Sequence, residues 1–148
     1  MKFEKFLKSV GTHGRICARN NGEDWLICGG VGMLIPMGVD TLLGVGEVPE
    51  KINMLVNGIC NADTDDKVEL VKATIPADGK QRDIVRIFSD GLTEIGISNE
   101  DFGLLEKSDI NLAYVEVEID EDSPDVKFLL VLDQHDNVIG FIEEKIIK

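Results

Sequence analysis

The stretch that decides the fold is KFLLVLDQHDNVIGFI, residues 127–142. Its first six residues are mostly apolar, which is typical of a strand buried near the centre of a sheet. Asp136-Asn137 has the composition of a turn, and residues 138–142 then form the returning strand of a hairpin. Two strands joined by a short turn pair antiparallel. This segment therefore predicts an antiparallel sheet with residues 127–132 near its middle.

The same signals recur along the rest of the chain. Phe3, Phe6, Leu7 and Val10 have helical spacing, Pro49 begins a second helical pattern that reaches Ile59, and Ser98 is the N-cap of a third. Runs of strand composition bounded by turn residues occur at 15–19, 25–28, 33–35, 68–75, 83–88, 93–97 and 113–119. We therefore predict an α+β fold, with mainly antiparallel sheet of seven to nine strands and about three short helices.

The length and the charge of the chain limit the classes of protein to which it can belong. A chain of 148 residues fits one domain, and the acidic loop at 61–67 is a possible subdivision within it. Residues 1–60 hold six acidic and six basic residues, whereas residues 61–148 hold 22 acidic and nine basic residues, so the whole net charge of −13 lies after residue 60. Such a surface repels nucleic acid and anionic lipid and favours basic proteins or cations. The alternative is that the charge only maintains solubility.

The N-terminus and the cysteines indicate a cytoplasmic, reduced protein. The N-terminal residues lack the apolar core of a signal peptide, and no apolar run approaches the length of a membrane span. An odd number of cysteines, three, is not a disulfide framework. Cys17 and Cys28 are expected to face each other across a hairpin with His13 nearby, which makes these three residues weak candidates for a metal site. We predict no cofactor.

The residues of this chain do not have the spacing that the motifs of common catalytic sites require. The glycines of Gly29-Gly30-Val31-Gly32 are not spaced as in a dinucleotide fingerprint, and a tight turn or bulge requires the same residues. The acidic run that begins at Asp63 lacks the glycine and glutamate of an EF-hand, because Val68 and Thr74 stand at those positions. No serine lies in a nucleophile elbow. These failures favour a protein that is not an enzyme.

One acidic segment is the best candidate for a binding surface. Three of its carboxylates alternate with apolar residues in the predicted strand at 113–119, and two more follow directly. On one strand such side chains lie about 6.6 Å apart and do not converge as catalytic carboxylates do. The candidate binding residues are Glu116, Glu118, Asp120, Glu121 and Asp122.

Two segments carry a resemblance to known proteins. Residues 3–36, with a helix, a strand, an Asn-Gly turn and apolar strands that end at Pro36, resemble half of a sliding-clamp domain. Residues 132–142, LDQHDNVIGFI, are similar to the last hairpin of small proteins carried by phages and mobile elements of gut Firmicutes. The first resemblance implies a clamp-like oligomeric replication accessory, and the second implies a phage or mobile-element origin. Sliding clamps need a basic inner face for DNA, and the acidic second half departs from that requirement.

These observations leave three hypotheses. The first is a non-enzymatic interaction protein whose acidic surface binds a basic protein, including the version in which carboxylates mimic DNA phosphates. The second is a small metal-dependent protein or enzyme that uses His13, Cys17 and Cys28. The third is a homo-oligomer that associates through the apolar strand at 128–132 as a sheet edge.

Overall fold

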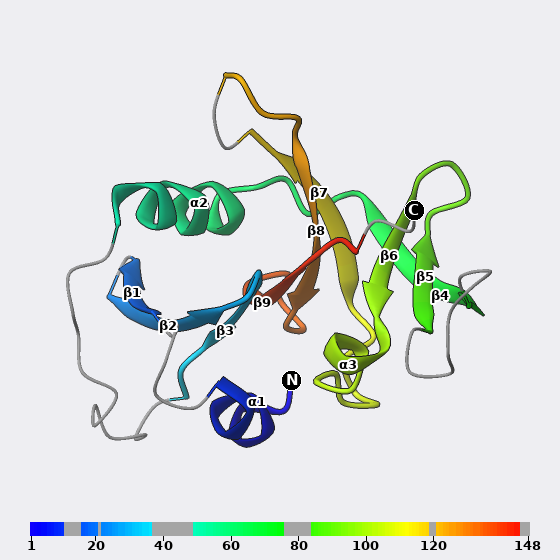
Figure 1. The fold of residues 1–148 in the computed structure, drawn as a ribbon, viewed down its shortest axis with the longest axis horizontal. Coiled ribbons are helices and arrows are strands. Elements are labelled where there is room, and N and C mark those ends of the chain that lie inside the picture. The colour runs from blue at the N-terminus through cyan, green and yellow to red at the C-terminus, as the bar shows by residue number, and fades with distance from the viewer. Residues whose placement is uncertain (11–15, 21, 37–48, 76–83, 119–120, 146–148) are drawn as a thin grey trace.

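The computed structural model describes residues 1–10, 16–20, 22–36, 49–75, 84–118 and 121–145 (Figure 1). The described residues form nine strands and three helices, so the predicted α+β class and strand number are confirmed. The helices are α1 (Phe3–Val10), α2 (Glu50–Cys60) and α3 (Asn99–Phe102). The strands are β1 (Ile16–Asn20), β2 (Glu23–Cys28), β3 (Val31–Leu34), β4 (Lys67–Thr74), β5 (Val85–Ser89), β6 (Glu94–Ser98), β7 (Leu112–Val117), β8 (Val126–Leu132) and β9 (Val138–Glu143).

All nine strands belong to one antiparallel sheet, in the order β1-β2-β3-β9-β8-β7-β4-β5-β6. The predicted central strand is β8, which pairs with β7 on one side and β9 on the other. The hypothesis that residues 128–132 form an exposed sheet edge is therefore wrong, because both edges of β8 are already hydrogen-bonded. Strands from before and after the acidic loop at 61–67 are neighbours, since β3 pairs with β9.

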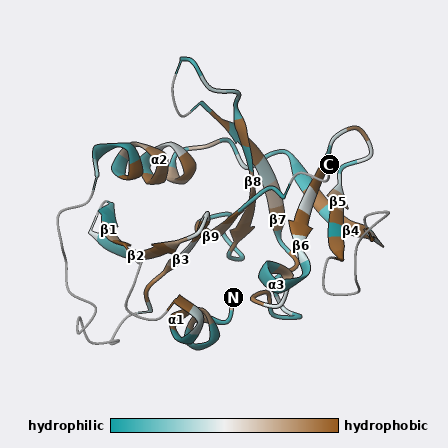
Figure 2. Ribbon diagram, viewed as in Figure 1, coloured by the Kyte–Doolittle hydropathy of each residue, from teal (hydrophilic) through white to brown (hydrophobic). Residues whose placement is uncertain are grey.

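The middle of the sheet buries apolar side chains on both faces. Along β8, Phe128 and Leu130 pack on one face, while Leu129 and Val131 pack on the other. Helix α2 covers the first face, and α1 lies on the second together with side chains of β5 and β6. Figure 2 shows the resulting hydrophobic band along β8 and β9. A strand that is buried on both faces consists mostly of consecutive apolar residues, and this is the pattern of residues 127–132.

The last three strands in the sheet order, β4, β5 and β6, form a unit that we call the β4–β6 arm. Strand β4 pairs with β7 only through Lys67–Ala113 and Val68–Leu112, and its remaining residues pair with β5 except Val71, where the register shifts. The arm curls over the second face, so that β6 contacts β8 and the Lys145 backbone N–H donates to the Gly96 carbonyl over 2.7 Å. The sheet is therefore partly closed on itself, and this bend leaves the outer part of β7 without β4 beside it.

Two local predictions are confirmed with small shifts of boundary. Gly29 and Gly30 have φ of 59° and 81°, which is the left-handed backbone that a tight hairpin turn requires, and β3 resumes at Val31, two residues earlier than expected. The Ser98 hydroxyl accepts a hydrogen bond from the Asp101 backbone N–H over 3.1 Å and caps α3 as predicted.

Candidate functional site

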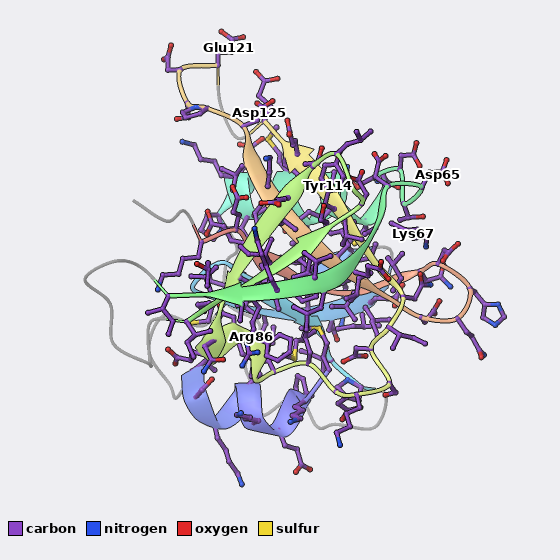
Figure 3. The ribbon with its side chains drawn as sticks, turned by 90° about the vertical axis from the view of Figure 1, so that its right-hand side faces the viewer. Asp65, Lys67, Arg86, Tyr114, Glu121 and Asp125 are labelled. Carbon is purple, nitrogen blue, oxygen red and sulfur yellow. The ribbon has the colours of Figure 1, made fainter. Side chains whose placement is uncertain are left out.

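The hairpin of β7 and β8 projects from the body of the protein, and Glu121 and Asp125 lie at its outer end (Figures 1 and 3). Glu116 is exposed in β7, opposite Lys127 of β8, and Glu118 is exposed just beyond the end of the strand. Glu121 and Asp122 are exposed in the connection between the strands, where Asp125 adds a further carboxylate. Asp120 lies outside the described residues. The predicted strand is therefore shorter than expected, and its acidic residues extend around the hairpin tip.

Two carboxylates of this strand share a groove with carboxylates of another segment. A groove of about 600 Å³ lies beside the outer part of β7, and the acidic loop that follows α2 forms its other wall. Asp63 and Asp66 of that loop line the same groove as Glu116 and Glu118. We call it the hairpin groove. Its lining residues are Gly58, Ala62, Asp63, Asp66, Tyr114, Val115, Glu116, Val117 and Glu118, among which there is no basic side chain.

Backbone pairing holds the acidic loop beside β7. The Tyr114 N–H donates to the Asp66 carbonyl over 3.1 Å, and the register of β4 with β7 begins at the next residue, Lys67. A hydrogen bond within the loop also constrains its conformation, because the Asp63 carboxylate accepts from the Asp65 N–H over 2.9 Å. Asp63 and Asp66 are thereby fixed at the rim of the hairpin groove, which an unconstrained loop would not achieve.

Like charges are crowded at this rim. The negative charge of Asp63 raises the pKa of the Asp65 carboxyl above its ordinary value, with smaller contributions from the hydrogen bond to Asp63 and from the charge of Asp66, while Lys67 opposes the rise. Two carboxylates that are close together resist simultaneous ionisation. A positive group that docks here relieves this repulsion.

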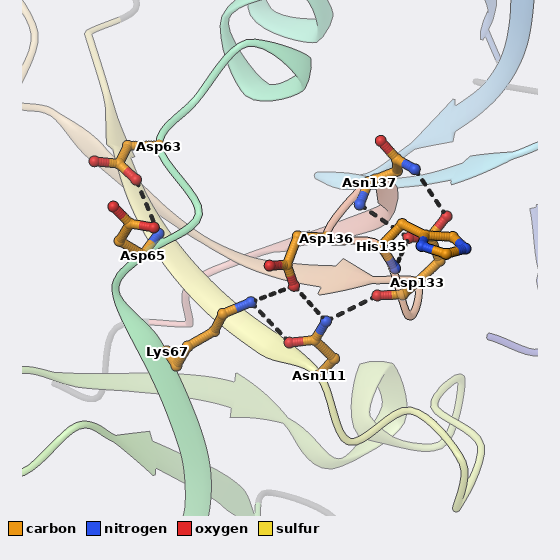
Figure 4. Close-up of polar contacts among 8 residues, drawn as sticks. All are labelled: Asp63, Asp65, Lys67, Asn111, Asp133, His135, Asp136 and Asn137. Atoms are coloured by element: carbon orange, nitrogen blue, oxygen red, sulfur yellow. Dashed lines mark hydrogen bonds and ion pairs between the residues drawn. The ribbon is translucent and has the colours of Figure 1, made fainter.

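A separate network neutralises Asp136, in the loop between β8 and β9 (Figure 4). Lys67 Nζ lies 2.7 Å from Asp136 Oδ1 and donates to Asn111 Oδ1 over 2.8 Å. The Asn111 amide in turn donates to Asp136 Oδ1 over 2.7 Å and to the Asp133 carbonyl over 2.8 Å. The hydrogen bond from Asn111 and the nearby Lys67 lower the pKa of Asp136. Asp136 is exposed, like the carboxylates of the hairpin, but its charge is paired with Lys67.

The predicted metal ligands are not brought together in the way that was expected. The hairpin register places Cys17 opposite Leu26, so Cys17 and Cys28 are not direct partners, and both pack partly buried against the apolar core. His13 lies outside the described residues. Among the residues that the structure describes, no group of three or more His, Cys, Asp or Glu side chains is arranged to hold a metal ion.

The third cysteine occupies a different environment. Cys60, at the end of α2, lines a hollow of about 390 Å³ together with Asn20, Glu23 and Trp25. Burial raises the pKa of the Cys60 thiol, and the negative charge of Glu23 raises it further, against a hydrogen bond to Asn20. A raised pKa keeps the thiol protonated at neutral pH and makes it a poor nucleophile.

Sequence reasoning missed the contribution of the acidic loop to the binding surface. From the sequence, the acidic loop at 61–67 is a possible subdivision of the domain and does not match an EF-hand. Its position beside β7 depends on the pairing of two strands far apart in sequence. Tyr114, in the lining of the groove, was also missed, and its hydroxyl lies 3.4 Å from Thr93 Oγ1. The only sequence signal at Tyr114 is the regular alternation of residue types in the segment that begins at Ala113.

Comparison of the chain with protein-family models, with curated proteins and with solved structures gives no match. The resemblance to a sliding clamp and to phage proteins therefore stays a prediction. No helix in the described part of the chain is long and apolar enough to cross a membrane.

Proposed function

We propose that this chain is a non-enzymatic interaction protein that binds a basic protein partner through the hairpin groove and the acidic tip of the β7–β8 hairpin. One observation carries the proposal: carboxylates from two separate segments, Asp63 and Asp66 on one side and Glu116 and Glu118 on the other, line one groove whose lining has no basic residue. Complementary charge of this kind steers a partner to its site and fixes its orientation.

The lining of the hairpin groove also suits a protein chain. Val115, Val117 and Ala62 add apolar surface to this lining. The aliphatic stems of lysine and arginine can pack on such surface while their charged ends reach the acidic rim. A bare cation makes no use of the apolar part. The groove therefore favours a lysine- or arginine-bearing surface of a protein as its occupant.

A DNA-binding protein is the specific kind of partner that we favour, in which case the acidic hairpin mimics DNA. The tip presents Glu121 and Asp125 beyond the groove (Figure 3), and Asp122 is exposed next to Glu121, so negative charge continues along the projecting hairpin. A phage or mobile element would use such a protein to occupy the basic site of a host enzyme. In that case duplex DNA and this chain compete for the same partner, which a displacement measurement detects directly.

The test is capture of basic proteins from a bacterial extract by the immobilised chain. At about 0.01 M salt the screening length is about 30 Å, and at 0.15 M it falls to about 8 Å, so bound partners are expected at low salt and are released as salt rises. The decisive variant removes the four carboxylates of the groove. Its substitutions are Asp63→Asn, Asp66→Asn, Glu116→Gln and Glu118→Gln.

A matched control removes four exposed carboxylates elsewhere and leaves the same net charge. Its substitutions are Glu4→Gln, Glu50→Gln, Glu100→Gln and Glu106→Gln. Loss of binding by the groove variant with retention by the control is the expected result. Equal loss by both variants, or no basic partner for the unmodified chain at low salt, contradicts the proposal.

A further inference from the structure

The outer half of β7 has a free edge on the side of the hairpin groove. On its other side β7 pairs with β8 along its whole length. Its register with β4 ends at the pair of Lys67 and Ala113. One further backbone hydrogen bond follows, from the Tyr114 N–H to the Asp66 carbonyl, and β4 runs away from β7 to pair with β5 (Figure 1). Among the described residues, no strand pairs with β7 beyond Tyr114 on this side.

The backbone groups of Glu116 point to this free edge. Successive residues of a strand direct their N–H and C=O groups to opposite sides. The Tyr114 N–H points to the β4 side, because it donates to the Asp66 carbonyl. The register of β7 with β8 runs without a shift as far as Val117, so Glu116 directs its N–H and C=O to the same side as Tyr114. An unpaired strand edge is a template for a further strand.

The side chains along this edge alternate between charged and apolar. Val115 and Val117 pack partly buried against the apolar cluster on the face that α2 covers. Glu116 is exposed on the opposite face, and Glu118 is exposed two residues further on. A strand that pairs with this edge places its side chains directly beside those of β7. Basic side chains at alternate positions therefore meet the carboxylates, and apolar side chains between them meet the valines.

The charges of the hairpin groove distinguish between possible occupants. A second copy of this chain that paired through the same edge brings Glu116 and Glu118 close to their own counterparts, and like charges opposite each other are destabilising. Charged side chains protect edge strands against self-pairing in this way. Across the groove, Asp63 and Asp66 add two further negative charges. The lining therefore favours a strand from another protein that carries positive side chains.

We propose that the hairpin groove receives an extended basic segment of the partner as an added strand on the free edge of β7. The segment carries lysine or arginine at alternate positions, and its backbone exchanges hydrogen bonds with Glu116. In strand addition the backbone hydrogen bonds provide affinity and the alternating side chains provide specificity. This inference rests on the function proposed above and adds the conformation of the occupant, since a folded basic surface also meets the charges but makes no such pairing.

The test compares three synthetic peptides by calorimetric titration of the full chain. The first alternates lysine and valine and is capped at both ends. The other two have the same sequence and charge, but the backbone nitrogens of the lysines are methylated in one and those of the valines in the other. Methylation removes the donors along one edge of the peptide. We expect the first peptide to bind and at least one methylated peptide to bind about tenfold or more weakly.

The outcomes separate this inference from the function on which it rests. Equal affinity of all three peptides means that charge alone holds them, which overturns the added strand and leaves the proposed function standing. Absence of binding by all three also overturns the added strand, and capture of a basic protein from the extract then identifies a folded surface as the occupant. Failure of both the peptides and the capture overturns both proposals.

Two substitutions at Glu116 separate its backbone from its carboxylate. Glu116→Gln removes the charge and keeps the N–H, whereas Glu116→Pro removes both. Proline is tolerated in an edge strand where the N–H faces outward, as it does at this position. We expect Glu116→Pro to bind the first peptide about tenfold or more weakly than Glu116→Gln does. Equal affinity of the two variants, with circular dichroism showing that both are folded, contradicts the added strand. If Glu116→Pro is unfolded, the methylated peptides decide the question on the unmodified chain.

Hydrogen exchange of the Glu116 N–H, followed by NMR, measures the pairing directly. With free peptide at about ten times its Kd, exchange is expected to slow by about tenfold, because only the unbound chain exposes this group. The Val115 N–H, which faces β8, is the control and is expected to exchange slowly with and without peptide. Unchanged exchange at Glu116 overturns the proposal. Self-association of the unmodified chain in sedimentation equilibrium that is lost in Glu116→Pro identifies a second copy as the occupant and overturns it also.

Discussion

Gly32 of β3 and Phe141 of β9 are register partners, and the aromatic ring of Phe141 occupies the space that a Cβ atom at position 32 would fill. The ring also packs against Trp25, with centroids 5.8 Å apart, and edge-on against Phe128, with centroids 5.6 Å apart. Aromatic side chains of β2, β9 and β8 thus meet on the face that α2 covers, and Gly32 of β3 lies in the sheet between β2 and β9.

We expect Gly32→Ala to destabilise the protein, because the new methyl group overlaps the Phe141 ring. Overpacking of this kind costs about 1–3 kcal/mol. Phe141→Ala removes a fully buried ring and is expected to cost about 3–5 kcal/mol. In the double variant the overlap is absent, so its loss in the free energy of urea unfolding is expected to be smaller than the sum of the two single losses by about 0.5–3 kcal/mol.

Gly58→Ala provides the matched control for this prediction. Gly58 lies in α2, where a Cβ atom meets nothing within 4 Å. Alanine in a helix interior is about 0.5–1 kcal/mol more stable than glycine, so this substitution is expected to stabilise. If Gly32→Ala is as harmless as Gly58→Ala, the close packing of β3 on the Phe141 ring is not present in solution.

The elements could be predicted from the sequence because their signals are local. The apolar run at 127–132, the helical spacing that reaches Ile59 and the Ser98 cap each depend on a few neighbouring residues, and each element formed where expected. The order of the strands could not be predicted in this way. It depends on contacts such as β3 with β9, which join residues more than 100 positions apart.

The same distinction applies to the candidate site. The acidic row at Glu116 and Glu118 was visible as alternation, but its meeting with Asp63 and Asp66 requires β4 to bend away from β7 after only two residue pairs. Cys17 and Cys28 were expected to face each other across the hairpin, but they are not register partners. The pairing of Asn20 with Glu23 beside the turn places Leu26 opposite Cys17, since the register of a hairpin follows from the length of its connection.

The second prediction concerns the contribution of Asp136 to the free energy of unfolding at low pH. Hydrogen bonding from Asn111 and the charge of Lys67 lower the pKa of Asp136 in the fold, so the ionised form is the one that the native state favours. The resulting stabilisation is complete above the unfolded value of about 3.9 and is lost as pH falls through the lower folded value. We expect Asp136→Asn to flatten the acid limb of the unfolding free energy, measured by urea titration between about pH 5 and 2.

Lys67→Met tests the cause of this effect. It removes the ion pair with Asp136 and leaves the Asn111 hydrogen bond in place. The pKa of Asp136 is then expected to move part of the way back toward its ordinary value, so the acid limb becomes intermediate between those of the unmodified chain and Asp136→Asn. Identical acid limbs in all three proteins contradict the network as a source of stability.

The third prediction is that Cys60 reacts slowly with alkylating reagents. Burial raises the pKa of its thiol, and the charge of Glu23 adds to the rise, so the reactive thiolate is scarce at neutral pH. Glu23→Gln removes the charge and is expected to lower the pKa and increase the rate of alkylation, followed for each cysteine by mass spectrometry. Reaction at the rate of the urea-unfolded chain contradicts burial of this thiol.

The last prediction concerns the charge crowding at the hairpin groove. The negative charge of Asp63 raises the pKa of the Asp65 carboxyl, so Asp63→Asn is expected to lower that pKa toward about 3.9. Asparagine keeps the side-chain oxygen that accepts the hydrogen bond from the Asp65 N–H, so the loop is expected to keep its shape. The carbon-13 resonance of the Asp65 carboxyl, followed by NMR as a function of pH, reports the change.

The same resonance links this crowding to binding. A basic partner in the hairpin groove supplies positive charge beside Asp65, so its pKa is expected to fall on binding in the unmodified chain and to fall less in Asp63→Asn, where the repulsion has already been reduced. Glu4→Gln, in α1, is the control and is expected to leave the titration of Asp65 unchanged. If Asp63→Asn has no more effect than Glu4→Gln, the charge of Asp63 is not what resists ionisation of Asp65, and the hairpin groove lacks the stored repulsion that a basic partner would relieve.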